Sequence, residues 1–162
     1  MAKDSLCCHT EPEILTKIAA IAAPWRGRKD MLLEVLRQAQ EVSGNYLPED
    51  VAAVVAKEMD IAQSTVFGVI SFYSFLSTEK RGKNIIRMCK SAPCHVKGAA
   101  EMLKAFEDAL GIPVGGTTPD GKFTLEFCEC LGICDKAPAV MINDQIFGPI
   151  NATNVSEVLA KF

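Results

Sequence analysis

The hydrophobic positions of the chain follow two different periods, one in each half. Between residues 12 and 75 the apolar side chains recur every three or four positions, which is the spacing of an amphipathic helix. The repeat is interrupted at Pro24, at Ser43-Gly44-Asn45 and at Asp60. The pattern therefore predicts four helices whose apolar faces pack into a small bundle.

In the second half the period shortens to that of β-strands. Residues 84–89 form a short run of β-branched and apolar side chains, and residues 123–127 alternate between the two faces of a strand. A helical period between these runs covers residues 96–110. Two further strands, at 139–142 and 145–148, are joined by a predicted turn, and a closing helix is expected over 153–161.

These patterns indicate an α/β protein of two parts. The polar stretch at residues 79–84 has the composition of a linker. We expect a helical bundle over residues 1–81, and a domain over residues 82–162 with the order β-α-β-β-β-α. That order is compatible with a thioredoxin-like sandwich.

Composition and charge exclude several classes of protein. The chain has 162 residues and a net charge of -3, and its basic runs, at residues 26–29 and 80–83, are too short for a nucleic-acid footprint. Its longest aliphatic stretch, residues 18–23, is far below the roughly 20 residues of a membrane span. The amino terminus lacks the apolar core of a secretory signal, so we expect a cytoplasmic protein.

Seven cysteines change the picture most: Cys7, Cys8, Cys89, Cys94, Cys128, Cys130 and Cys134. An odd number of cysteines in a reducing compartment argues for metal binding or redox chemistry rather than for a disulfide framework.

Two cysteine pairs have the spacing of metal ligands. Cys89 and Cys94 form a C-x4-C pair, and Cys130 and Cys134 form a C-x3-C pair, each following a predicted strand. Four thiolates from two loops satisfy the two irons of a 2Fe-2S cluster, which each need two soft ligands in tetrahedral geometry. Pro93 favours a helical first turn around Cys94. By spacing alone, a structural four-cysteine zinc site and a set of buried structural cysteines remain open.

The motifs that contain these pairs carry a resemblance to a known family. The segments are Cys89-x4-Cys94-His-Val-Lys-Gly-Ala and Phe127-x-Glu-Cys130-Leu-Gly-x-Cys134-Asp-Lys-Ala-Pro-Ala-Val-x-Ile-Asn, together with Phe72-Tyr73-Ser74-Phe75 at the end of the helical half. They resemble the thioredoxin-like 2Fe-2S subunit of respiratory NADH dehydrogenase (complex I) and of NAD-linked, often electron-bifurcating, hydrogenases and formate dehydrogenases.

The resemblance covers nearly the whole chain, and it implies a thioredoxin-like 2Fe-2S ferredoxin domain behind the helical bundle. It implies one cluster on Cys89, Cys94, Cys130 and Cys134, with FMN and NAD(P) carried by a partner flavoprotein. Further iron-sulfur or catalytic subunits are expected in the same complex. The segment that begins at Cys94 and the downstream residues 116–125 are more similar to the hydrogenase and formate dehydrogenase branch than to the respiratory one.

Other residues invite rival interpretations. Cys128 could compete as a ligand, but we expect a small buried side chain beside the cluster. His95 follows Cys94 directly, and Cys7-Cys8-His9 could bind a metal, yet four cysteines already suffice and the terminus offers no fourth ligand. The aromatic segment at residues 72–75 is interpreted either as core or as a face that docks a partner.

Nucleotide-binding and catalytic motifs are missing from the sequence. It contains neither the glycine-rich fingerprint of a dinucleotide site nor a Walker lysine, and its two histidines leave little acid-base chemistry. We therefore assign no catalytic residue and expect an electron relay without turnover of its own. The alternatives are a zinc-stabilised interaction module and an iron-sulfur redox sensor.

Overall fold

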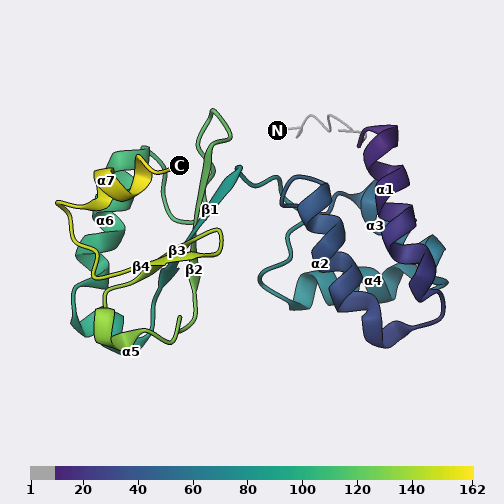
Figure 1. Ribbon diagram of the computed structural model, residues 1–162, viewed down its shortest axis with the longest axis horizontal. Helices are drawn as coiled ribbons and strands as arrows, with labels where there is room; N and C mark the ends of the chain where they lie inside the picture. The colour runs from purple at the N-terminus through teal and green to yellow at the C-terminus, as the bar shows by residue number, and fades with distance from the viewer. Residues whose placement is uncertain (1–9) are drawn as a thin grey trace, which may run out of the picture. The chain divides into compact units, whose positions relative to one another are not determined.

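The computed structural model describes residues 10–162, which form two compact units (Figure 1). The first unit ends at Lys80 and the second runs from Arg81 to Phe162. No helix within the described range is both long enough and apolar enough to span a membrane.

Up to Lys80, the described residues of the first unit hold four α-helices, as the period predicts. They are α1 (Pro12–Ala22), α2 (Leu32–Val42), α3 (Glu49–Met59) and α4 (Gln63–Phe72), with short 3-10 turns η1 (Ala23–Trp25) and η2 (Lys29–Met31) between the first two. Pro48 precedes α3 in an extended conformation, as its N-cap residue. Asp60 ends the same helix in the left-handed conformation, with φ of 57°.

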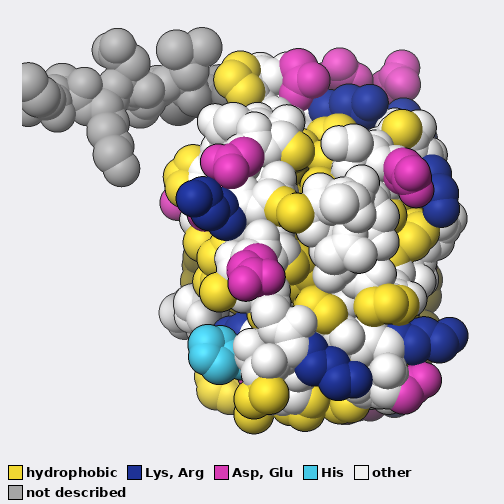
Figure 2. Space-filling model, turned by 90° about the vertical axis from the view of Figure 1, so that its left-hand side faces the viewer, with side chains coloured by type: hydrophobic (Ala, Val, Ile, Leu, Met, Phe, Trp, Pro, Cys, Tyr) yellow, Lys and Arg dark blue, Asp and Glu magenta, His cyan; other side chains and the backbone are white. Residues whose placement is uncertain are grey.

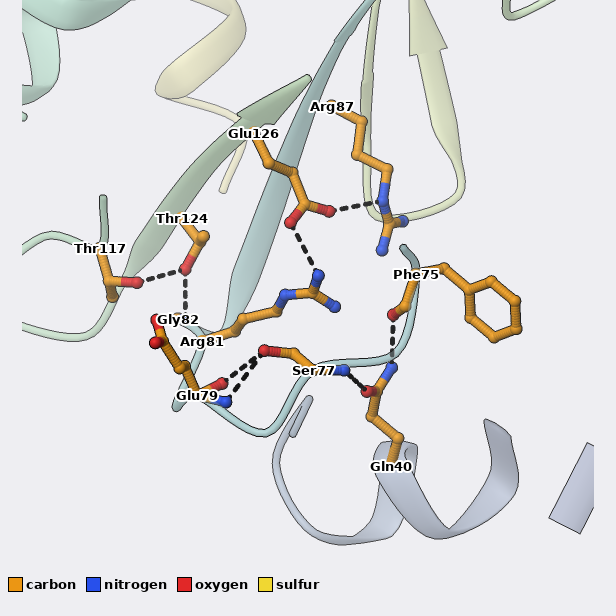
Figure 3. A network of polar contacts seen from close by, with 10 residues as sticks. All are labelled: Gln40, Phe75, Ser77, Glu79, Arg81, Gly82, Arg87, Thr117, Thr124 and Glu126. Atoms are coloured by element: carbon orange, nitrogen blue, oxygen red, sulfur yellow. Dashed lines mark hydrogen bonds and ion pairs between the residues drawn. The ribbon is translucent and has the colours of Figure 1, made fainter. Parts of the chain in front are cut away.

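The segment that follows α4 folds back onto the helical unit. Phe75 packs against the helical core and Leu76 is buried in it. The side-chain amide of Gln40 donates to the Phe75 carbonyl at 2.9 Å and accepts from the Ser77 amide at 2.9 Å (Figure 3). One buried amide thus satisfies two backbone groups that no helix or strand would otherwise pair.

The second unit is built on a four-stranded sheet over residues 81–162 with the strand order β2-β1-β3-β4. Strand β1 pairs in parallel with β2, whereas β1 with β3 and β3 with β4 are antiparallel. The elements are β1 (Asn84–Cys89), α5 (Ala92–Val96), α6 (Ala99–Leu110), β2 (Phe123–Cys128), the 3-10 turn η3 (Cys134–Lys136), β3 (Val140–Ile142), β4 (Gln145–Phe147) and α7 (Val155–Leu159).

Helices α6 and α7 lie on one side of this sheet (Figure 1). Their buried side chains, such as Phe106 and Val158, share one core with Ile86 and Met88 of β1 and Leu125 of β2. Because side chains alternate along a strand, Arg87 and Cys89 belong to the opposite face of β1. The expected α/β architecture, a helical bundle followed by a domain of mixed helices and strands, is confirmed.

Two local expectations differ from the structure. The helix expected over 96–110 begins only at Ala99, because Gly98 adopts a left-handed conformation with φ of 97°, and Val96 instead ends the separate helix α5. Residues 79–84 are expected as a linker, but from Arg81 onward this stretch already belongs to the second unit. There the Gly82 amide donates to Oγ1 of Thr124 at 2.6 Å, and a Cβ atom at position 82 would lie 2.8 Å from the Phe123 backbone.

Candidate metal centre

The candidate site lies where the parallel strands β1 and β2 end. Cys89 is the last residue of β1 and Cys128 the last residue of β2, and the two are register partners. Loops leave the sheet from both positions toward Cys94 and Cys130. The parallel register therefore brings the starts of two cysteine-containing loops, distant in sequence, to the same end of the sheet.

Cys89 and Cys94 form a buried pair in which each residue is only 2% exposed. The strand holds Cys89, and the first turn of α5 holds Cys94, with Pro93 beside it as the sequence predicts. We call Cys89 and Cys94 the inner pair.

Cys130 and Cys134 form an exposed pair with a distance of 3.7 Å between their sulfur atoms. Cys134 opens the short turn η3, while Cys130 lies in the preceding loop. The Gly132 amide donates to the Cys130 sulfur at 3.4 Å, and Gly132 has a left-handed φ of 81° that suits glycine. We call Cys130 and Cys134 the outer pair.

Packing connects the two pairs. Leu131 and Ile133, which lie between the outer cysteines, pack against the buried cluster that contains the inner pair and Ala139. The Cys89 amide donates to the Ala139 carbonyl at 3.2 Å. The loop that carries the outer pair thus also covers the inner pair.

Charge and burial move the thiol pKa values in different directions. Burial alone would raise the pKa of Cys89, but hydrogen bonds from Ser91, Cys94 and Leu131 hold it below its ordinary value. Burial, followed by the hydrogen bond with Cys89, raises the pKa of Cys94. The hydrogen bond with Cys130 raises the pKa of Cys134. In the inner pair, Cys94 is therefore favoured as the proton donor and Cys89 as the acceptor.

The donor set fits a two-iron cluster. Such a cluster needs two soft ligands on each iron, and the structure supplies thiols in two pairs, with the Gly132 amide directed at the Cys130 sulfur. Within residues 10–162, no three Cys, His, Asp or Glu side chains are gathered tightly enough to enclose a single metal ion.

The rival residues lie in different surroundings. Cys128 is half-buried beside Cys89, and burial raises its pKa to about 11. Strand β2 ends at Cys128, so Cys130 lies beyond the strand. His95 is exposed on α5. The cysteines at positions 7 and 8, with His9, lie outside the described residues.

An ion-pair cluster near the site was missed in the sequence. Glu126 of β2 accepts from Arg87 of β1 at 2.9 Å and pairs with Arg81 at 3.0 Å (Figure 3). Each strand interrupts its apolar run once with a charged residue, at Arg87 and at Glu126. Opposite charges in the middle of two apolar strands were the available signal.

Comparison with a family model confirms the thioredoxin-like fold that the order of elements predicts. The model, described as thioredoxin-like [2Fe-2S] ferredoxin, matches residues 18–162.

Individual proteins are similar along most of the chain. The chain is 39% identical over 131 residues to the NADP-reducing hydrogenase subunit HndA of Solidesulfovibrio fructosivorans, which covers 81% of this chain and 76% of that protein. It is 33% identical over 150 residues to one of the subunits of the NADH-quinone oxidoreductase of Aquifex aeolicus, covering 93% of both.

Among solved structures, the NAD+-reducing [NiFe]-hydrogenase in its air-oxidized state matches 88% of this chain with a TM-score of 0.70 and 22% identity. This chain spans 23% of that hydrogenase chain, so the likeness concerns the fold.

Proposed function

The chain belongs to the thioredoxin-like [2Fe-2S] ferredoxin family, and from that premise we propose that it is an electron-transfer subunit of a larger NAD(P)H-linked oxidoreductase complex. Membership of the family implies one [2Fe-2S] cluster. We assign its four ligands to the inner pair, Cys89 and Cys94, and to the outer pair, Cys130 and Cys134. The observation that supports this assignment is that Leu131 and Ile133, the residues between the outer cysteines, pack against the buried inner pair.

The protein's own residues prepare the site for negative charge. Hydrogen bonding by Ser91 and Leu131 lowers the pKa of Cys89, and the Gly132 amide donates to the Cys130 sulfur at 3.4 Å. Hydrogen bonds to sulfur stabilise the thiolate form, which is the form that binds iron. When bound, a [2Fe-2S] cluster takes up and releases one electron at a time.

The partner we propose is a flavoprotein subunit that binds FMN and oxidises NADH or NADPH. Hydride transfer moves two electrons together, so a flavin has to divide the pair before a one-electron relay can accept either of them. Subunits of a hydrogenase and of an NADH-quinone oxidoreductase are among the relatives. We favour an electron-bifurcating hydrogenase or formate dehydrogenase, with respiratory NADH dehydrogenase next, and a cytoplasmic location, where thiols stay reduced.

The experiment that tests this role combines metal analysis with an activity assay. The full chain, purified without oxygen and reconstituted with iron and sulfide, is assayed for NADH-dependent dye reduction with and without the flavoprotein subunit. We expect iron and sulfide in equal amounts, and turnover only with the flavoprotein. Tightly bound zinc would support an interaction module instead, and turnover by the chain alone would refute the relay role.

For the helical unit we propose the docking of that flavoprotein. Phe72, at the end of α4, is 79% exposed and packs edge-to-face on Tyr73, with ring centroids 5.0 Å apart. An exposed aromatic pair is typical of the centre of a protein interface. We expect Phe72→Glu to reduce co-purification with the flavoprotein, whereas Ile146→Glu, at an exposed apolar position of β4, leaves it unchanged. Equal binding by both variants would contradict the docking role.

A further inference from the structure

The three charged residues Arg81, Glu126 and Arg87 form a compact ion cluster on the second unit. Oε2 of Glu126 lies 3.0 Å from Nη2 of Arg81, and Oε1 lies 2.9 Å from Nε of Arg87. Figure 3 shows the carboxylate between the two guanidinium groups. One carboxylate faces two arginines, so the three side chains together carry a net charge of one positive unit.

The cluster has a defined place relative to the candidate metal centre. Arg87 and Glu126 are register partners on β1 and β2, and two positions further along the same strands the register partners are Cys89 and Cys128. Residues two positions apart on a strand share a face and are roughly 6–7 Å apart along it. The net positive charge therefore lies on the face of β1 that carries Cys89.

Burial gives this charge a longer reach than a surface charge has. The side chains of Arg81, Glu126 and Arg87 are 9%, 18% and 21% exposed. On the face of the molecule drawn in Figure 2, acidic and basic side chains are interspersed, so their solvent-screened fields largely cancel. A partly buried charge is screened much less.

We propose that the net positive charge of Arg81, Glu126 and Arg87 raises the reduction potential of the cluster bound at Cys89. This inference rests on the proposed function. Reduction adds one electron, and its negative charge is stabilised by the net positive charge two residues along the strand. Glu126 limits the effect because its carboxylate offsets one of the arginines.

The test is a redox titration of the reconstituted full chain, with dithionite as the electron donor and the electron paramagnetic resonance of the reduced cluster as the readout. We expect Glu126→Gln to raise the midpoint potential and Arg87→Gln to lower it. Arg81→Gln should also lower the potential, so the sign can be measured even where Arg87→Gln does not fold. The double variant Arg87→Gln with Glu126→Gln should lie between the two single variants.

Matched controls use charges exposed on the helices. Glu157→Gln on α7 and Lys104→Gln on α6 make the same changes of charge at exposed positions and should leave the potential unchanged. The conservative variants Glu126→Asp and Arg87→Lys keep each charge and should keep the potential near that of the parent chain. A purely structural role would change cluster content without opposite shifts of potential.

Failure of this inference can be distinguished from failure of the proposed function. Shifts of the same sign from Glu126→Gln and Arg87→Gln, or shifts no larger than those of the controls, would overturn the inference while the cluster itself is present. Failure of the unaltered chain to bind iron and sulfide would instead contradict the proposed function, and this inference would fall with it.

Discussion

The inner and outer cysteine pairs differ in almost everything except residue type. The inner pair is buried, and a strand and a helical turn fix its two backbone positions. The outer pair is exposed and lies in a loop and a short 3-10 turn. The difference teaches that regular structure positions one half of the candidate centre, while local hydrogen bonds such as that from Gly132 position the other.

The largest effect should come from removing one thiol of either pair. Cys89→Ala and Cys130→Ala are each expected to abolish cluster assembly, because three thiolates leave one iron short of a ligand. Unfolding of the second unit should become easier as well, since ligation contributes to folding free energy. Iron, sulfide and visible absorbance per chain are the measurements. Normal iron in Cys130→Ala together with its loss in Cys128→Ala would transfer the ligand role to Cys128.

The inner and outer pairs should also differ in the rate at which their thiols react in the metal-free chain. We expect Cys130 and Cys134 to react with a maleimide at least about 100-fold faster than Cys89 and Cys94, because buried thiols react only after a local opening. Cys128, half-buried, should fall between the pairs. Mass spectrometry of digests taken over time gives the rate at each position. Equal rates at the four thiols would contradict the distinction between an inner and an outer pair.

A smaller effect is expected at the glycine of the outer loop. Gly132→Ala places a Cβ atom on a residue with φ of 81° and no neighbour within 4 Å, so backbone strain of about 1–2 kcal/mol is the only cost. The urea concentration at which visible absorbance is lost should fall. Gly111→Ala is the matched control, because Gly111 has φ of 67° and equally open space but ends α6. It should destabilise the fold without weakening the cluster selectively.

The smallest effect should be that of Cys128→Ala. The side chain is small and half-buried, and the variant is expected to keep its cluster and lose about 1 kcal/mol of stability. Urea unfolding followed by circular dichroism measures the loss, and iron analysis confirms that the cluster is retained. Depletion of iron in this variant alone would show that the half-buried thiol is a ligand.

Much of the architecture could be predicted from periodicity. The four helices of the first unit lie where the apolar spacing is helical, and the strands of the second unit lie where the spacing becomes that of a strand. Helix boundaries were less predictable, because Gly98 divides a continuous apolar period through its backbone conformation alone.

The candidate site was predictable only in part. The spacing of the cysteines indicated two pairs, and the structure packs the loop of the outer pair against the inner pair at the end of β1. That the four thiols are the ligands remains a prediction. Which pair is buried depends on the strand register and on packing by residues such as Ala137. The packing of Leu131 and the carbonyl of Ala139 that accepts from the Cys89 amide come from loops, which have no period to detect.

Charged residues at the start of the second unit escape sequence analysis for a physical reason. A run of polar side chains favours solvent, so the pattern predicts Arg81 in a linker. Its partner Glu126 lies far along the chain, and only the folded sheet brings the two together. Sequence patterns describe neighbours along the chain, whereas an ion pair of this kind is a property of the tertiary structure.

The close backbone contact at Gly82 has a consequence for protein engineering. The side chain of Gln40 is hydrogen-bonded to the Ser77 amide in the first unit. Gly82 already packs against the backbone of Phe123 in the sheet, where a larger residue does not fit. The exposed residues 78–80 between them are therefore the place for a protease site or a spacer. A junction designed even two residues later would require rebuilding the first contact of the sheet.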